Sequence, residues 1–361
     1  MKLYEIVAAL EVIAPTRDAA AWDNVGLLVG DPEQDVKSAL LAIDLTCEVL
    51  AEAIGKHQLV VAYHPPIFEG IKRVKAGSVV FDAIRAGVAI YSPHTALDVA
   101  PGGTNDVLAD ALGMTDRTPL RANDEKDEAY KLVFFAPPAD VEKVSRAAFD
   151  AGAGRIGAYS SCSFRAPGTG TFFGEVGTNP AVGERGRLEA VEELRVEIVV
   201  PIARVDAVVR ALRAAHSYEE PAFDLVKLAP APRGVGLGRV GRVAKTTRGE
   251  LVDRAKKALG AEHVLVAGRL DADATRIAVC AGSCGDLVHE ASRAGVDLYL
   301  TGELRHHDAL RAAAAGMTVV CALHSVSERA TLPHLARRLT ADAPGLDVVV
   351  SVADRDPFRI V

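Results

Sequence analysis

The chain lacks several features, and each absence excludes a class of protein. No apolar run approaches the ~20 residues that a membrane-spanning helix requires. The net charge is −7 at pH 7, whereas a protein that follows nucleic-acid phosphates needs a basic stripe. The first residues, Met1 to Glu5, begin an amphipathic pattern that carries an acid, unlike a signal peptide. We therefore expect a cytoplasmic protein with no membrane partner, and we do not expect nucleic acid as a partner.

Cysteine is scarce as well, and its spacing fits none of the usual cysteine-based sites. The cysteines are odd in number, include no CxxC pair, and are Cys47, Cys162, Cys280, Cys284 and Cys321. Scattered cysteines of this kind are typically small buried hydrophobic residues in a reducing compartment. A redox pair at Cys280 and Cys284 is the minor alternative, because no base lies near them in the sequence. The sequence predicts reduced thiols.

What the chain does contain is typical of a globular protein. Of its 361 residues, 49% are hydrophobic and 25% are charged. This length suggests two or three domains. Near both ends, short apolar segments alternate with helical patterns, which indicates an α/β domain with a mainly parallel sheet.

Two breaks divide the chain. Residues 121–127 are polar and charged, and a second break is marked by Pro230, Pro232 and Gly234. The predicted parts are residues 1–125 and 233–361, the two halves of one α/β domain, and residues 126–232, an inserted domain. In the halves we expect helices near 3–13, 46–55, 79–86, 104–113, 249–259, 286–294, 303–315 and 326–339. We expect strands near 22–30, 39–44, 59–63, 88–92, 263–267, 276–281, 296–301, 317–323 and 346–351.

The inserted segment has a different pattern. Its expected elements are strand 131–135, helix 139–151, glycine-rich strands within 157–176, strand 194–200, helix 205–215 and strand 222–228. Two successive βαβ units in this order match the split pattern of a ferredoxin-like α+β domain. The overall prediction is an α/β protein in two parts with a ferredoxin-like insert.

Three expected strands deliver a histidine where they end. Strand 59–63 runs into His64, strand 88–92 into His94, and residues 319–323 into His324. In open α/β sheets, ligands collect outside the carboxyl ends of the strands. A carboxylate follows two of these histidines by four residues, as Asp98 and Glu328. Together these placements favour a metal site assembled from both ends of the chain.

The pair His324 and Glu328 carries the most specific signal. Residues four apart lie on one face of a helix, so the imidazole and the carboxylate can reach a common point. Nitrogen and oxygen ligands of this kind suit Zn, Mn or Fe. The alternative is a structural histidine followed by a capping box between Ser325 and Glu328. Taken alone, His64 is typical of a structural histidine and Asp98 of a turn residue.

Several separated motifs resemble the Nif-three-like family, whose bacterial members are often labelled GTP cyclohydrolase type 2 homologues. They are Tyr63-His64-Pro65-Pro66-Ile67-Phe68, Ser92-Pro93-His94-Thr95-Ala96-Leu97-Asp98, Thr301-Gly302-Glu303-Leu304-Arg305-His306-His307 and His324-Ser325-Val326-Ser327-Glu328-Arg329. The middle segment is similar to the PII/CutA-like insert of the longer members, through residues 152–160 and 216–221. The resemblance spans nearly the whole chain.

This resemblance implies a toroidal hexamer with a dinuclear metal centre. Carried over by position, His64 and Asp98 bind one metal, His324 binds the other, and Glu328 bridges the two. The bacterial pattern has a second histidine where this chain has Tyr63, and a neutral phenol is a poor ligand. We therefore expect one or two divalent ions per protomer, with one site tight and the other weaker.

The remaining histidines and glycines have weaker signals. His94, His306 and His307 are candidates for orienting ligands or transferring protons, although a histidine in the alanine-rich segment after residue 305 is also expected to be simply exposed. The stretch Gly282 to Gly285 follows a strand and would suit either an anion at a helix start or a tight turn. The expected function is metal-dependent hydrolysis of a small nucleotide or phosphate-type substrate. The alternative is a non-enzymatic metal-binding scaffold with a ligand-sensing insert.

Overall fold

A computed structural model describes residues 1–123, 129–229 and 234–360. Contacts divide the chain into two compact units, one formed by Met1–Asn123 with Arg233–Val361 and the other by Asp124–Pro232. These boundaries lie within two residues of the predicted ones. Most of the polar stretch expected at 121–127 and all four residues before Gly234, including Pro230 and Pro232, lie outside the described residues. None of the described helices is long and apolar enough to cross a membrane.

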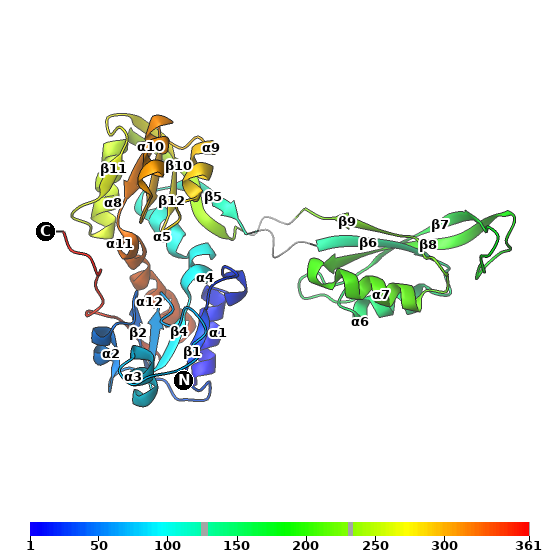
Figure 1. Cartoon of the computed structure of the whole chain (residues 1–361), viewed down its shortest axis with the longest axis horizontal. Coiled ribbons are helices and arrows are strands. Elements are labelled where there is room, and N and C mark those ends of the chain that lie inside the picture. The colour runs from blue at the N-terminus through cyan, green and yellow to red at the C-terminus, as the bar shows by residue number, and fades with distance from the viewer. Residues whose placement is uncertain (124–128, 230–233, 361) are drawn as a thin grey trace. The chain divides into compact units, whose positions relative to one another are not determined.

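The first unit contains two sheets. The five-stranded sheet has the order β1 (Gly26–Val29), β4 (Ala89–Ser92), β3 (Leu59–Ala62), β2 (Ser38–Ala42) and β15 (Asp347–Val350). All neighbours are parallel except β1 and β4. Helices α1 (Leu3–Ile13) and α12 (Thr331–Asp342) share a hydrophobic core with one face, and α2 (Cys47–Ala53) and α3 (Val79–Ala86) share one with the other (Figure 1). Burial on both faces explains why its central strands are continuously apolar.

The six-stranded sheet has the order β11 (Leu265–Ala267), β14 (Thr318–Cys321), β13 (Leu298–Thr301), β12 (Asp273–Cys280), β10 (Gly236–Thr247) and β5 (Thr115–Ala122). Only β12, β13 and β14 are mutually parallel. Helices α5 (Thr104–Ala111) and α8 (Arg248–Leu259) pack on one face, and α9 (Leu287–Arg293) and α10 (His306–Ala314) on the other. The short helices α4 (His94–Val99) and α11 (His324–Arg329) and the 3-10 turn Thr16–Asp18 complete the unit.

The two halves of the sequence exchange strands. The last strand, β15, pairs with β2, and β5 from the first half pairs with β10 from the second. The predicted helix 326–339 is two helices, α11 and α12. Strands β5 and β10 were not predicted, because β5 is polar and mostly exposed and contains Pro119. Arg121, expected in a linker, lies in β5. The sheets are therefore more mixed than the expected parallel pattern.

The second unit is a single antiparallel sheet with two helices. Its elements are β6 (Ala129–Ala136), α6 (Val141–Asp150), β7 (Phe164–Phe173), β8 (Leu188–Pro201), a 3-10 turn (Ile202–Arg204), α7 (Val205–Ala215) and β9 (Phe223–Lys227). The strand order is β7-β8-β6-β9. Alternate residues of β6 and β8, such as Leu132, Phe134 and Ile198, pack against both helices. The predicted order of elements is confirmed in this segment.

A buried ion pair joins the two halves of the first unit. The side chain of Arg239, on β10, is 2% exposed and forms two hydrogen bonds with Asp106 of α5, at 2.9 and 3.0 Å. Its other guanidinium nitrogen donates to the carbonyl oxygens of Gly236 and Gly238, at 2.7 and 2.8 Å. Burial alone would raise the pKa of Asp106, but Arg239 holds it below the usual value.

Removing this arginine should destabilise the protein strongly. In Arg239→Met the apolar stem remains, but Asp106 becomes a buried charge without its strongest partner. The loss should cost about 3–5 kcal/mol of unfolding free energy. Urea unfolding followed by circular dichroism measures this loss. The matched control is Lys245→Met on the same strand, because Lys245 forms an exposed pair with Asp273 and should change little. Equal stability of the two variants would contradict the structural role of Arg239.

Candidate metal centre

Three side chains from two sheets meet at one point. His64 follows β3 of one sheet, and His324 and Glu328 lie on α11, directly after β14 of the other. One ligand atom from each of the three lies within 4.8 Å of the others. The Glu328 carboxylate lies between the two imidazoles, with Oε2 3.2 Å from His64 Nε2 and Oε1 3.3 Å from His324 Nε2. The predicted helical spacing of His324 and Glu328 therefore places both on one site.

A second carboxylate orients each imidazole. Asp44 Oδ1 lies 2.9 Å from Nδ1 of His64, and Glu303 Oε1 lies 3.0 Å from Nδ1 of His324. Each Nδ1 is therefore occupied and each Nε2 points at Glu328. Metal-binding histidines typically have this arrangement, in which a carboxylate fixes the ring and increases its basicity.

The donor set fits a divalent transition metal. His64 Nε2 and Glu328 Oε2 are buried and, apart from their mutual contact at 3.2 Å, have no partner among the described residues. A nitrogen and an oxygen this close, with no other partner, are placed to bind one ion between them. Two imidazoles and one carboxylate are the ligands of several catalytic zinc sites and of non-haem iron sites. No side-chain capping bond starts α11, whose N-cap is Leu323, so the capping-box alternative is not observed.

The carboxylates around His64 also determine its protonation. Burial alone would lower the pKa of His64, but Asp44 and Glu328 raise it to about 10. The hydrogen bond with His64 in turn lowers the pKa of Asp44. The site therefore stabilises a positive charge at the position between His64 and Glu328.

Asp98 lies outside this group. The Tyr63 hydroxyl donates to Asp98 Oδ1 and is also 3.1 Å from Thr104 Oγ1, and both Tyr63 and Asp98 are buried. Burial and the charge of Glu328 raise the pKa of Asp98 to about 6. The close group contains His64, His324 and Glu328 but not Asp98, and the expected pairing of His64 with Asp98 on one metal stays a prediction. The Tyr63 hydroxyl therefore forms a hydrogen bond with Asp98, the carboxylate that the resemblance assigns to a metal.

The other predicted histidines separate into two kinds. The ring of His94 lies 5.3 Å from that of His64, and its Nδ1 is 2.8 Å from Asp23 Oδ1. His306 and His307 are exposed at the start of α10, where their rings contact each other at 5.4 Å. Of these three, only His94 borders the cluster.

Backbone strain occurs at two of the strand ends. His94 has a φ of 25° and Leu323, which precedes His324, has a φ of 70°. Few residues other than glycine adopt positive φ, and such strain is typical of functional sites. At Leu323 it allows α11 to begin at His324 directly after β14.

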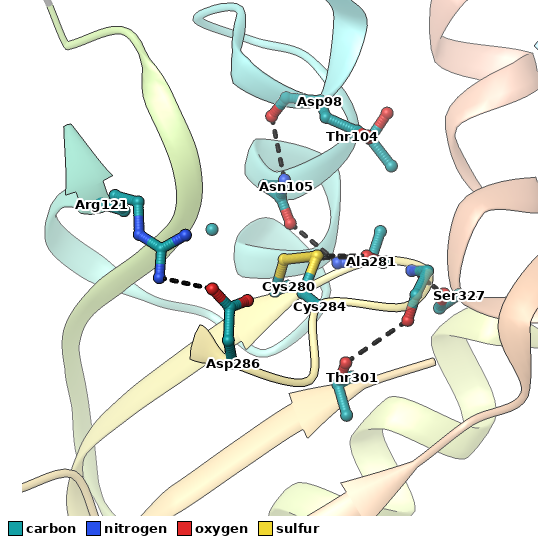
Figure 2. The surroundings of a disulfide bond; sticks show 12 residues. Asp98, Thr104, Asn105, Arg121, Cys280, Ala281, Cys284, Asp286, Thr301 and Ser327 are labelled. Carbon is teal, nitrogen blue, oxygen red and sulfur yellow. Dashed lines mark hydrogen bonds and ion pairs between the residues drawn. A yellow bond between two sulfur atoms is a disulfide. The ribbon is translucent and has the colours of Figure 1, made fainter. Parts of the chain in front are cut away.

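The sequence predicts reduced thiols, and this prediction is wrong for Cys280 and Cys284. The structure joins them in a disulfide (Figure 2). Cys47, Cys162 and Cys321 are free. The glycine-rich turn between them lies against the metal cluster, since a Cβ on Gly282 would be 2.5 Å from Glu328 Oε1. The minor alternative of a paired Cys280 and Cys284 is the observed one.

A polar cavity of about 580 Å³ adjoins the cluster. Glu303, which holds His324, lines it together with Arg305, Arg311 and His289. Asp308, in the same wall, pairs with Arg311 at 3.1 Å, and Arg305 has no ion-pair partner among the described residues. The cavity wall therefore holds an arginine without a close ion pair, together with the acids Asp286, Glu303 and Asp308, and it reaches an outer residue of the cluster.

Sequence reasoning missed three acids of the site. Asp44 and Glu303 each follow a strand, β2 and β13, so the rule that found the histidines could have found them too. Asp23 lies in a turn far from His94 in the sequence, and its contact carries no local signal. Burial alone would raise the pKa of Asp23, but His94 and Thr95 lower it.

Comparisons with known proteins agree on one family. A sequence model described as Duf34/NIF3 (NGG1p interacting factor 3) matches residues 1–357. The chain is 35% identical over 365 residues to a "GTP cyclohydrolase 1 type 2 homolog" of Halalkalibacterium halodurans, covering 99% of this chain and 98% of that protein. A protein of the same name from Mycobacterium tuberculosis is 39% identical over 316 residues, which are 86% of this chain and 83% of that protein.

Solved structures agree with the sequence comparisons. A Bacillus cereus protein related to NIF3 is 33% identical with a TM-score of 0.70, and the match covers 100% of this chain and 99% of that one. Staphylococcus aureus protein SA1388 is 27% identical with a TM-score of 0.78 over the same shares. The expected resemblance is confirmed: this chain belongs to the Duf34/NIF3 family.

Proposed function

We propose that this protein binds a divalent metal ion at His64, His324 and Glu328 and uses it to hydrolyse a small nucleotide or phosphate-type substrate. The observation that carries the proposal is the placement of Glu328 between two imidazoles that are each oriented by another acid. Zn, Mn and Fe are the ions that suit this donor set. A bound ion of this kind supplies an activated water and stabilises negative charge on a reacting oxygen.

The side chains of the chain would then position the substrate. The cavity beside Glu303 has a volume within the range of small-molecule sites. Arg305 offers a planar guanidinium, which suits a phosphate or carboxylate. His94, held by Asp23 against His64, lies where it can exchange a proton with solvent at the site. The name of the curated relatives, GTP cyclohydrolase 1 type 2 homolog, is consistent with a nucleotide substrate.

We propose further that the chain forms a homo-oligomer, with a hexamer as the expected state. The support is an aromatic surface next to the site. Trp22 and Phe68 are both more than half exposed and their rings lie 5.7 Å apart. Exposed aromatic pairs are typical of surfaces that a partner covers.

A second candidate function is a metal-binding regulator with a ligand-sensing insert. The insert has the β-α-β-β-α-β order of a ferredoxin-like domain, as PII/CutA-like proteins do. It contains a cavity of about 620 Å³ lined by several aromatic side chains, among them Phe135, Phe172 and Tyr218. A cavity of this size and lining is typical of a small-molecule site.

Purified protein should bind one metal ion tightly per protomer. The Tyr63 hydroxyl donates a hydrogen bond to Asp98, and a neutral phenol is a poor metal ligand. A second ion, which would lack a strong nitrogen ligand here, should therefore bind weakly. In Tyr63→His an imidazole replaces the phenol, and a second tight equivalent should appear. Elemental analysis after dialysis against Mn²⁺ measures both values. Tyr63→Phe is the control, because it frees Asp98 without adding a ligand. Two equally tight equivalents in the unaltered protein would contradict this prediction.

Metal affinity should rise with pH. Because the pKa of metal-free His64 is about 10, an incoming ion must displace a proton from it at neutral pH. With one proton displaced, the affinity for Mn²⁺ should increase about tenfold per pH unit between pH 7 and 9. Calorimetric titrations in buffers of different ionisation enthalpy count the released proton. A constant affinity over this range would show that His64 is already neutral.

Glu328→Gln should abolish turnover and reduce metal affinity by more than about 100-fold, because it removes the charge between the imidazoles. Asp44→Asn should have a smaller effect, about 10–100-fold on affinity, since it acts only by orienting His64. Turnover is measured on a panel of nucleotides and phosphoesters with Zn²⁺, Mn²⁺ or Fe²⁺ supplied. The control is Glu262→Gln, an exposed acid outside the site. If the unaltered, metal-loaded protein turns over nothing on the panel, the hydrolase proposal fails and the regulator remains.

A further inference from the structure

We propose that Cys280 and Cys284 form a thiol–disulfide modification site that controls metal affinity at the neighbouring centre. This inference rests on the proposed metal site, which it extends by a regulatory input. It starts from the position of the disulfide, which closes the turn between β12 and α9. That turn lies beside Ser327, which precedes Glu328, and beside Asn105, which is bonded to Asp98 (Figure 2).

The two sulfurs differ in access. Cys280 is fully buried at the end of β12, whereas Cys284 is half-buried, and its Sγ lies 3.2 Å from the carbonyl oxygen of Ala281. A small thiol or disulfide in solution therefore reaches Cys284 first. An accessible cysteine beside a buried one is the usual arrangement of an attacking and a resolving thiol.

Gly282, between the two cysteines, is held by the site. Its N–H donates to Ser327 Oγ at 2.9 Å, and Ser327 immediately precedes Glu328 on α11. Its carbonyl oxygen accepts from the N–H groups of Gly302 and Glu303, both at 3.1 Å. The residue that orients His324 and the helix that carries Glu328 therefore both depend on the backbone of this turn.

The turn also contacts the ligands and the first half of the chain. A Cβ on Gly282 would be 2.5 Å from Glu328 Oε1 and 3.6 Å from His324 Nε2, so no side chain fits here and the turn lies close against both residues. The N–H of Ala281 donates to Asn105 Oδ1 at 2.9 Å, and the Asn105 amide donates to the carbonyl oxygen of Asp98 at 2.9 Å (Figure 2). A shift of this turn would therefore move the metal ligands.

The covalent step is exchange with a low-molecular-weight disulfide such as oxidised glutathione. The Cys284 thiolate attacks one sulfur of this disulfide and releases one small thiol, leaving a mixed disulfide on Cys284. The Cys280 thiolate then attacks Cys284 Sγ and releases the second small thiol. Two protein thiols are oxidised and one small disulfide is reduced to two thiols. Reduction follows the same path in reverse.

The disulfide should favour metal binding. It fixes both ends of a turn whose backbone supports Ser327 and Glu303, whereas the dithiol leaves Cys284 free to move with the turn, in which Ser283 and Asp286 are exposed. Preorganised ligands lose less conformational freedom on binding. By linkage, a bound metal must stabilise the disulfide by the same factor that the disulfide increases metal affinity.

The test titrates Mn²⁺ into full-length protein after oxidation with glutathione disulfide or after reduction with dithiothreitol and desalting. Mn²⁺ is chosen because it has little affinity for thiolates. The dithiol form should bind Mn²⁺ about fivefold or more weakly than the disulfide form. Cys284→Ser and Cys284→Ala should bind as weakly as the dithiol form and should not respond to either treatment. Cys47→Ser, which removes an exposed cysteine on α2, should respond like the unaltered protein.

A second measurement distinguishes a failure of the metal-site proposal from a failure of the redox coupling. Alkylation of denatured protein followed by intact mass counts the free thiols at each glutathione ratio, with three expected in the disulfide form and five after reduction. The glutathione ratio at which half of the Cys280–Cys284 pair is oxidised should shift when Mn²⁺ is present. The shift should equal the factor found in the metal titrations. Equal Mn²⁺ affinity in both redox forms overturns the coupling and leaves the metal site standing. Absence of any Mn²⁺ binding, with a pair that still titrates, defeats the metal-site proposal and the coupling but leaves the thiol pair.

Discussion

The first unit depends on the charge balance around Glu328. Its carboxylate is almost completely buried between two imidazoles that come from different sheets. A buried carboxylate without a compensating charge is strongly unfavourable, so the site requires either a protonated histidine or a cation. The high pKa of His64 is the response of the metal-free site. A divalent ion satisfies the same electrostatic requirement and would bind both His64 Nε2 and Glu328 Oε2 in place of their direct contact.

The need to hold His64 and His324 at one point explains why the two sheets are rigidly connected. His64 and His324 can share one ion only if β3 and β14 keep their relative position, and the strand exchange through β15 and β5 fixes the connectivity. The buried pair of Arg239 and Asp106 adds a directional contact between α5 and β10. A buried ion pair contributes less net stability than a well-packed apolar contact would, but it specifies one arrangement of its partners. We attribute its presence here to positional accuracy.

The sequence predicted the buried elements and the histidines and acids at their ends that come together in the structure, because both produce local signals. The run of apolar residues before His64 and the four-residue spacing of His324 and Glu328 are visible without a fold. Strands β5 and β10 were missed because their pairing is set by tertiary contacts rather than by periodicity. The contact of Asp23 with His94 spans 71 residues, and the hydrogen bond between Tyr63 and Asp98 spans 35. Such contacts depend on how strand ends converge, which no local pattern specifies.

Position 63 is a tyrosine where the resemblance implies a histidine, and this residue affects Asp98 as well as the number of ligands. A phenol with a pKa well above 10 remains a hydrogen-bond donor at neutral pH, and here it donates to the acid that would otherwise accept a metal. Burial and the nearby charge of Glu328 already make ionisation of Asp98 unfavourable, and the hydroxyl offsets part of this cost. Tyr63 therefore stabilises the buried Asp98 side chain. On the proposed function, the centre would then work with one tightly held ion, and His94 and the cavity residues would have to supply what a second metal would provide.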